Sequence, residues 1–306
     1  MDTSLAIDTN ALRKMFNDFA AVRGLTLQVQ RGEVFGFLGP NGAGKTTSIK
    51  ILLGLVQPTS GSAKLLGKPI TDRQARARAG FLPEHFRFHD WLTAGEFLTL
   101  HGQLYGMEDS RIRKRAGELL ELVNLTSFRD KQLRTFSKGM LQRIGLAQAL
   151  LHEPELVFLD EPTSGLDPVG RRMVRDIIRG LRAAGTTVFL NSHLLSEVEI
   201  TCDRVAFIKH GEVVQVSEVS ALMEGSTSVT IRAHGVTDAA LAALAQWGRD
   251  VRLDGQNILL SVVDDDSLPE ITRCLVAHNV DVFSVVPQRL SLEDLFIQVV
   301  GTEGVL

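Results

Sequence analysis

The chain has 306 residues, of which 44% are hydrophobic and 23% are charged, and this composition excludes disordered and fibrous proteins. The length favours about two domains. A net charge of −3 and a pI near 6.3 give no overall field that would attract DNA or RNA, so we expect no nucleic-acid partner.

The first residues do not form a signal peptide, and no apolar run approaches the roughly 18 to 20 residues needed to cross a bilayer. We therefore expect that any role at a membrane requires another subunit. Cys202 and Cys274 lie far apart without metal-type spacing, which fits a reducing compartment and implies no disulfide.

The first predicted elements surround a glycine-rich loop. Apolar residues alternate from Leu25 to Val29, a turn follows, and residues 34–38 are typical of a buried strand. Residues 46–56 have the apolar spacing of a helix. The loop between strand and helix fits the pattern G-x-x-x-x-G-K-[ST]. Its residues are Gly39, Pro40, Asn41, Gly42, Ala43, Gly44, Lys45, Thr46 and Thr47.

A loop of this kind predicts a phosphate site. Backbone N–H groups at a helix N-terminus favour an anion, and glycines allow the backbone to wrap around it. Lys45 would supply a positive charge for the β- and γ-phosphates, and the Thr46 hydroxyl could be a ligand of Mg²⁺. The alternative, an ordinary glycine turn that ends in Lys-Thr, is disfavoured by the strand before the loop and the helix after it.

Helical periodicity dominates residues 91–152, with helices predicted over 96–105, 111–122 and 138–151, so we expect a helical subdomain at about 85–152. Its aromatic stretch from Phe86 to Tyr105 is either core or a groove for a partner. The histidines in this part of the chain lack a ligand set, so we assign no structural metal. They are His85, His89 and His101.

Two nearly continuous apolar segments, residues 156–159 and 186–190, predict strands of a parallel sheet that helices cover on both faces. The first is followed by Asp160 and Glu161, which places two acids at the edge of the sheet where ligands bind. Asp160 could hold Mg²⁺, directly or through water, and Glu161 could polarise an attacking water. A solvated turn is the alternative.

After a hairpin of residues 204–209 and 212–216 and a short helix to about Met223, residues 225–228 resemble a linker. Residues 229–306 then predict the order β-α-β-β-α-β and a last helix, which suggests a small ferredoxin-like α+β domain. We therefore expect domains at 1–224 and 225–306.

Residues 136–143, which precede Asp160 and Glu161 in the chain, are predicted to begin a helix. Ser137 is a good N-cap, Gly139 permits close approach of the backbone, and an apolar stripe follows from Met140 to Leu151. The N-terminus of this helix could therefore bind an anion.

These segments together resemble the ATP-binding-cassette (ABC) ATPases. The segment from Phe136 to Met140, 21 residues before Asp160 counted from Gly139, resembles the family's signature Leu-Ser-Gly-Gly-Gln. The segment Ser164-Gly165-Leu166-Asp167 resembles its D-loop, and Ser192-His193 resembles its switch histidine. The likeness covers residues 1 to about 220. It is closest to ATPase subunits of ABC-2 type transporters, many of which end in a motif like Leu292-Glu293-Asp294-Leu295-Phe296.

The resemblance implies an α/β P-loop NTPase fold with a parallel core sheet, an antiparallel β subdomain and a helical subdomain. It also implies a head-to-tail dimer that encloses two ATP molecules. In such a dimer Ser137 and Gly139 would contact the γ-phosphate of the other copy, with Lys138 beside them. His193 would sense that phosphate and act with Glu161 and Lys45 in catalysis, Asp167 would couple the two sites, and Phe16 would stack on adenine.

The sequence departs from the family pattern at three places. Glu84 occupies the position of a glutamine that touches Mg²⁺ and water, and we interpret it as a coupling residue that also contacts the metal with Thr46 and Asp160. Lys138 and Met140 replace the second glycine and the final glutamine of the signature. A lysine near phosphate is electrostatically favourable, and Ser137 and Gly139 remain, so catalysis is not excluded.

The resulting expectation is a Mg²⁺-dependent ATP hydrolase on the inner face of the cell membrane that drives export through a separate polytopic permease. It would pair with a second nucleotide-binding subunit, for which a homodimer is favoured and a heterodimer stays open. One alternative is a soluble ABC ATPase of translation or DNA maintenance, but such chains usually carry two cassettes, coiled coils or basic extensions. The other is a scaffold that binds nucleotide without hydrolysing it. Lys45, Asp160 and Glu161 are all in place, which argues against a scaffold.

Overall fold

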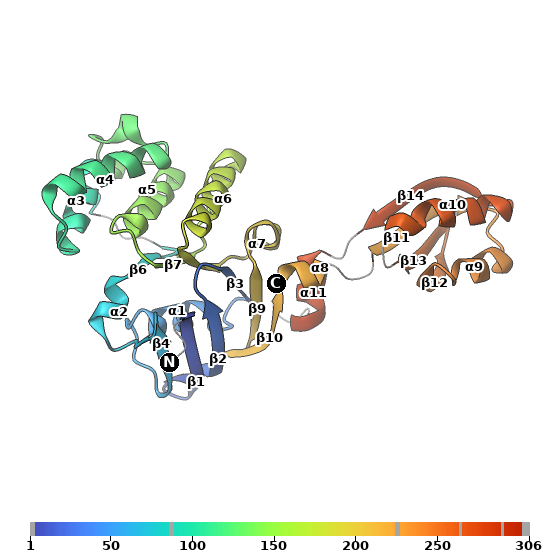
Figure 1. Ribbon diagram of the computed structural model, residues 1–306, viewed down its shortest axis with the longest axis horizontal. Helices are drawn as coiled ribbons and strands as arrows, with labels where there is room; N and C mark the ends of the chain where they lie inside the picture. The colour runs from blue at the N-terminus through green and yellow to red at the C-terminus, as the bar shows by residue number, and fades with distance from the viewer. Residues whose placement is uncertain (1–3, 86–88, 224–226, 263–264, 289–290, 302–306) are drawn as a thin grey trace. The chain divides into compact units, whose positions relative to one another are not determined.

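The structure is a computed structural model that describes residues 4–85, 89–223, 227–262, 265–288 and 291–301. The chain divides into two compact units (Figure 1), the first comprising Met1–Glu218 and Val299–Leu306 and the second spanning Val219–Gln298. Each unit has its own hydrophobic core. Among the described residues, no helix is long and apolar enough to cross a membrane.

The centre of the first unit is a six-stranded sheet. In sequence order its strands are β3 (Val34–Leu38), β6 (Ala79–Leu82), β7 (Leu156–Asp160), β8 (Thr187–Asn191), β9 (Arg204–Lys209) and β10 (Glu212–Glu218). Their spatial order is β10-β9-β3-β8-β7-β6, and all pairs are parallel except that of β9 with β10. Every residue of β3, β7 and β8 is buried, as expected for parallel strands covered on both faces. The predicted parallel sheet is confirmed.

A second, antiparallel sheet packs against the first. Its strands are β1 (Leu5–Phe16), β2 (Phe19–Gln30), β4 (Ser60–Leu65) and β5 (Lys68–Pro69), in the order β2-β1-β4-β5. One apolar cluster joins the two sheets and the helix after the glycine-rich loop, with Ile7, Phe35, Ile49 and Phe158 among its fully buried members. This core fixes the glycine-rich loop between the two sheets.

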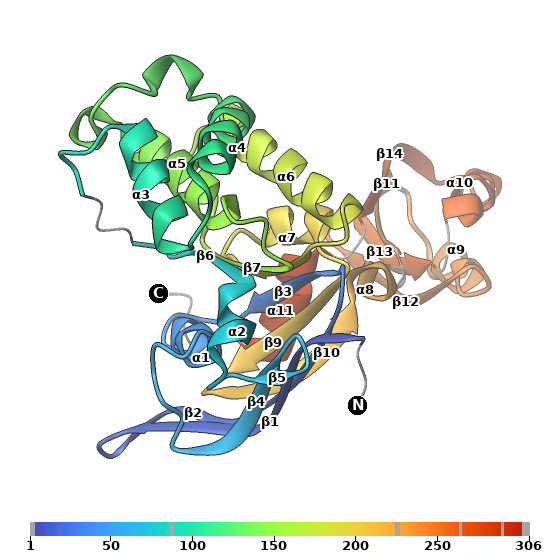
Figure 2. The ribbon, with the colours of Figure 1, turned by 60° about the vertical axis from the view of Figure 1, so that its left-hand side comes forward.

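The α-helices described in the first unit are α1 (Lys45–Leu52), α2 (Arg73–Ala77), α3 (Ala94–Leu104), α4 (Asp109–Leu122), α5 (Lys138–Leu150), α6 (Pro168–Ala183) and α7 (Leu195–Thr201), with two 3₁₀ turns at Thr126–Phe128 and Leu133–Thr135. Three of them, α3, α4 and α5, lie between β6 and β7 in sequence. In both ribbon views (Figure 1 and Figure 2) α3, α4 and α5 gather apart from β1, β2 and β4. This group is the predicted helical subdomain.

Helix α1 is shorter than predicted, because it ends at Leu52 and not at Val56. Gly54 adopts a φ of +69°, and the amides of Gly54 and Leu55 donate back to the carbonyls of Ile51 and Lys50. A glycine in this left-handed conformation is a common helix stop.

The aromatic stretch before α4 is divided between core and surface. Phe97 is buried, whereas Trp91 is 62% exposed. Phe86 and Phe88 lie outside the described residues.

The second unit has a four-stranded antiparallel sheet. Its elements are α8 (Val219–Met223), β11 (Thr227–His234), α9 (Asp238–Leu244), β12 (Gly248–Asp254), β13 (Asn257–Val262), a 3₁₀ turn (Asp265–Ser267), α10 (Leu268–Ala277), β14 (Asp281–Gln288) and α11 (Leu292–Val300). The sheet order β12-β13-β11-β14 is that of a ferredoxin-like fold, as predicted. The predicted linker needs correction, because Thr227 and Ser228 already pair with Val262 and Ser261 in β11. Gly225 and Ser226 lie outside the described residues.

A ring stack anchors the end of α3 to the segment before β7. Tyr105, the C-cap of α3, stacks on His152 with ring centroids 3.8 Å apart and an interplanar angle of 15°. Burial lowers the pKa of His152 to about 4. Between about pH 4 and 6.5, His152 is therefore neutral in the native state but protonated in the unfolded chain.

We expect the free energy of unfolding of the first unit to fall as the pH drops from 7 to 5, because only the unfolded state gains the proton. For a partly buried ring the loss is roughly 1 kcal/mol. His152→Phe keeps the stack and should remove this loss, whereas His89→Phe, on an exposed loop, should retain it. Urea unfolding followed by Trp91 fluorescence in a Trp247→Phe background measures the difference. Equal pH dependence of the two variants would contradict the expectation.

Candidate functional site

The glycine-rich loop connects β3 to α1, and close packing explains two of its glycines, Gly39 and Gly44. Gly44 has a φ of +96°, and a Cβ atom there would lie 2.2 Å from the carbonyl oxygen of Ala21. Gly44 is also the N-cap of α1, and no side chain caps the helix. The amides of the first turn are therefore open to an anion.

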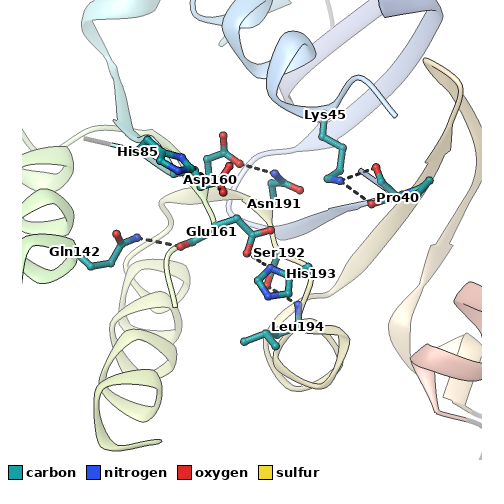
Figure 3. A network of polar contacts seen from close by, with 12 residues as sticks. Pro40, Lys45, His85, Gln142, Asp160, Glu161, Asn191, Ser192, His193 and Leu194 are labelled. Atoms are coloured by element: carbon teal, nitrogen blue, oxygen red, sulfur yellow. Dashed lines mark hydrogen bonds and ion pairs between the residues drawn. The ribbon is translucent and has the colours of Figure 1, made fainter. Parts of the chain in front are cut away.

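Lys45 lies over this loop. Its Nζ donates to the carbonyl oxygens of Gly39, at 2.6 Å, and Pro40, at 3.0 Å (Figure 3). Burial lowers the pKa of Lys45, while the nearby carboxylates of Glu161 and Asp160 act in the opposite direction. A bound phosphate would add negative charge near Lys45 and would further favour its protonated ammonium form.

Asp160 ends β7 and is only 1% exposed. Its Oδ2 accepts a hydrogen bond from the Thr46 hydroxyl at 3.4 Å, and its Oδ1 accepts from the Asn191 amide. Burial raises the pKa of Asp160, and the Asn191 hydrogen bond opposes that rise. A hydroxyl and a carboxylate at this separation are hard oxygen donors of the kind that Mg²⁺ prefers.

Glu161 follows directly and has a φ of +55°, a conformation that costs free energy in a non-glycine residue. Three hydrogen bonds hold this backbone: its N–H donates to the Asn191 carbonyl at 2.9 Å, and its carbonyl accepts from Gln142 Nε2 at 3.0 Å and from the Ser164 amide at 3.1 Å. The Glu161 carboxylate lies 2.6 Å from His193 Nδ1 (Figure 3). Burial raises the pKa of Glu161, and His193 opposes that rise.

Lys45 and Glu161 line one cavity of about 540 Å³. Its lining consists of Phe19, Ala21, Asn41, Gly42, Gly44, Lys45, Thr46, Thr47, Glu84, Glu161, Asn191 and His193. Asp160 is not in this lining, but its hydrogen-bond partners Thr46 and Asn191 are. The structure therefore brings together the loop, Glu84, Glu161 and His193, all named from the sequence. Phe16 is not part of this lining; it pairs with Phe19 at the end of the β1–β2 hairpin.

The signature segment lines a different cavity, of about 440 Å³, together with the D-loop. Ser137 caps α5 by accepting from the Met140 amide at 3.3 Å, and Asp167 caps α6 by accepting from the Gly170 amide at 2.8 Å. Lys138 and Gly139 lie between these caps. One copy of the chain thus has two separate cavities with different linings.

Sequence reasoning missed three residues in or beside the cavity of the phosphate loop: Asn191, Gln142 and Phe19. Asn191 ends β8 and is the register partner of Asp160, so the predicted parallel pairing of the two strands could have indicated it. Gln142 is a buried polar residue within α5. No motif or periodicity in the neighbouring sequence indicates its contact with Glu161. Phe19 could have been considered as a neighbour of Phe16.

The chain is similar to known proteins over most of its length. Residues 22–164 match the profile of the ABC transporter family. An ABC transporter ATP-binding protein of Synechocystis is 42% identical over 295 residues, which are 93% of this chain and 80% of that protein. The daunorubicin/doxorubicin resistance ATP-binding protein DrrA of Streptomyces peucetius is 37% identical over 97% of this chain and 92% of its own length. A solved dimeric ATP-binding cassette bound to ADP and phosphate has 25% identity and a TM-score of 0.64, covering 70% of this chain and 98% of that one.

Proposed function

Because this chain belongs to the ABC transporter family, as an ATP-binding subunit that hydrolyses ATP, we propose that two copies work together beneath a separate membrane-spanning permease. The chain would then lie on the cytoplasmic face of the cell membrane. Residues 1–224 would form the ATP-binding domain and residues 225–306 an accessory domain. DrrA is named for drug resistance, which supports export as the direction of transport.

In the proposed complex, the loop from Gly39 to Thr47 binds the phosphates of ATP. The amides at the N-terminus of α1 face the anion, and Lys45 supplies a charge for the β- and γ-phosphates. Phe16 is proposed to stack on adenine. It is 46% exposed, with Lys14 Nζ 4.8 Å from its ring centroid, so one face of the hairpin end is accessible to a base.

Thr46 and Asp160 are proposed to hold Mg²⁺, with Glu84 on the same cavity. Bound there, the ion would supply positive charge that offsets the negative charge of the ATP phosphates.

Glu161 is the proposed general base. A water attacks the γ-phosphorus in line with the leaving ADP, and Glu161 takes its proton. The raised pKa of the buried carboxyl makes it a stronger base than an exposed glutamate. His193 orients that carboxylate, while Lys45 and the loop amides stabilise the developing charge.

The signature segment would supply a second half-site, which completes this site only in a dimer. We place Ser137, Lys138 and Gly139 against the γ-phosphate that the other copy holds, at the N-terminus of α5. Asp167, which caps α6 next to them, would link the two sites. We propose that Glu84, on the cavity, and the exposed Trp91 lie between the ATP site and the permease. Glu84 would couple the state of the bound phosphate to the permease.

The single observation that supports this function best is the convergence of Lys45, Asp160, Glu161 and His193 around the N-terminus of α1. Asp160 and Glu161 come from the end of β7, Lys45 from the start of α1 and His193 from the loop after β8, and together they supply a metal ligand, base, cation and orienting group.

The test is the identity of the partner. The tagged Glu161→Gln chain is isolated with Mg-ATP from gently solubilised membranes, and its stoichiometric partners are identified by mass spectrometry. We expect a polytopic membrane protein in complex with two copies of the chain. A Lys45→Ala chain serves as the control for nucleotide-dependent assembly. Recovery of soluble partners or ribosomes alone would overturn the proposal and favour a soluble ABC ATPase.

A further inference from the structure

Asn191 occupies an unusual place beside the proposed metal site. It is the last residue of β8 and the register partner of Asp160, the last residue of β7. Because the strands are parallel and in register, both side chains leave the sheet on the same face and at the same edge. Asn191 is only 2% exposed, yet it lines the cavity of the phosphate loop.

The side chain of Asn191 binds Asp160, and its backbone binds Glu161. Its side-chain Nδ2 donates to Asp160 Oδ1, and its backbone carbonyl accepts from the Glu161 amide (Figure 3). A flipped amide would set its oxygen against a carboxylate oxygen, two acceptors without a proton between them. The orientation of the side chain is therefore fixed.

This orientation leaves Asn191 Oδ1 buried without a hydrogen-bond partner anywhere in the described part of the chain. A buried acceptor without a donor costs free energy, so such an atom calls for a ligand or water at the site. Asn191 Oδ1, the acceptor without a partner, belongs to the same side chain that donates to Asp160. Its donor is therefore expected among the groups that Asp160 would bind.

We propose that Asn191 is a positioning residue for the divalent cation of ATP hydrolysis. Its Nδ2 holds Asp160 so that Oδ2 faces the Thr46 hydroxyl, and its Oδ1 accepts from a water molecule on the cation. This inference rests on the proposed function, since it assumes that Thr46 and Asp160 are the metal ligands.

Asn191→Leu tests the role, because leucine has nearly the same size and shape but makes no hydrogen bond. Mn²⁺ binding to the full chain with a non-hydrolysable ATP analogue is followed by electron paramagnetic resonance. We expect its affinity for Mn²⁺ to fall about 10- to 100-fold, the range seen when a residue that orients a metal ligand is lost. Affinity for fluorescent ATP in EDTA should stay within about twofold, since the side chain of Asn191 donates to Asp160 and not to the phosphate loop.

The kinetic counterpart is a higher Mg²⁺ concentration for half-maximal ATPase rate, with most of the rate recovered at saturating Mg²⁺. Asn191→Ser retains a hydroxyl donor and should lose less Mn²⁺ affinity than Asn191→Leu. Leu190→Val, one residue earlier on β8 and equally buried, is the matched control and should bind Mn²⁺ like the wild type.

Wild-type affinity for Mn²⁺ in both Asn191 variants would overturn the inference while leaving the proposed function intact. An equal loss of ATP affinity in EDTA would also overturn it, because the residue would then support the fold of the loop and not the cation. A wild-type chain that neither binds Mn²⁺ with the analogue nor hydrolyses ATP would overturn the proposed function itself.

Discussion

Glu161→Gln is expected to slow ATP hydrolysis by at least about 100-fold, because a general base contributes roughly 10² to 10⁴ in rate. Glutamine has nearly the same shape and can keep a hydrogen bond to His193, but it cannot take a proton from water. The backbone contacts of residue 161 to Asn191 and Gln142 do not depend on the side chain. Affinity for Mg-ATP should therefore stay within about threefold. Phosphate release and equilibrium nucleotide binding measure the two quantities.

Glu155→Gln is a matched control for this prediction. It makes the same chemical change directly before β7, where Glu155 pairs with Arg31 and Arg78 away from the cavity. Its rate should equal that of the wild type. Full turnover by Glu161→Gln would show that another group takes the proton.

The fold of the first unit could be predicted because its signals are local. Strands β3 and β7 of the parallel sheet are short segments that are apolar up to Leu38 and Leu159, and each of these residues directly precedes residues that carry chemistry, the loop and Asp160. A buried parallel strand needs no alternation, so the apolar run itself marks it. The C-terminal unit could be predicted for a related reason, since turns such as Asp254–Gly255 separate its strands.

The residues that escaped prediction are those set by contacts between distant segments. Gln142 supports Glu161 across 19 residues, and Asn191 supports Asp160 across 31. Neither spacing follows from helical or strand periodicity; each depends on which elements become neighbours in space. The groups that would act on ATP can be predicted from the sequence. The residues that hold those groups in place can be predicted only when the order of the strands in the sheet is known.

The signature residues should act on the nucleotide of the other copy, and paired substitutions test this directly. Gly139→Asp places a carboxylate at the N-terminus of α5, where it suits the helix dipole but repels a γ-phosphate. An added Cβ at this position would lie 3.3 Å from Leu166 Cδ2, which a small side-chain shift can relieve. Lys45→Ala removes the cation from the phosphate loop. Each variant alone should lose at least about 100-fold in ATPase rate, because each lesion would then damage both sites of a symmetric dimer.

An equal mixture of the two single variants should regain activity, to about a quarter of the wild-type rate, if half of the dimers are mixed and each mixed dimer has one intact site. A mixture of Lys45→Ala with a chain carrying both substitutions should regain none, since every phosphate loop in it is damaged. If Ser137 and Gly139 acted on the ATP of their own copy, neither mixture could form an intact site and both would stay inactive. Recovery in the first mixture alone therefore requires that the two half-sites of one chain, which line separate cavities, are completed by a second chain.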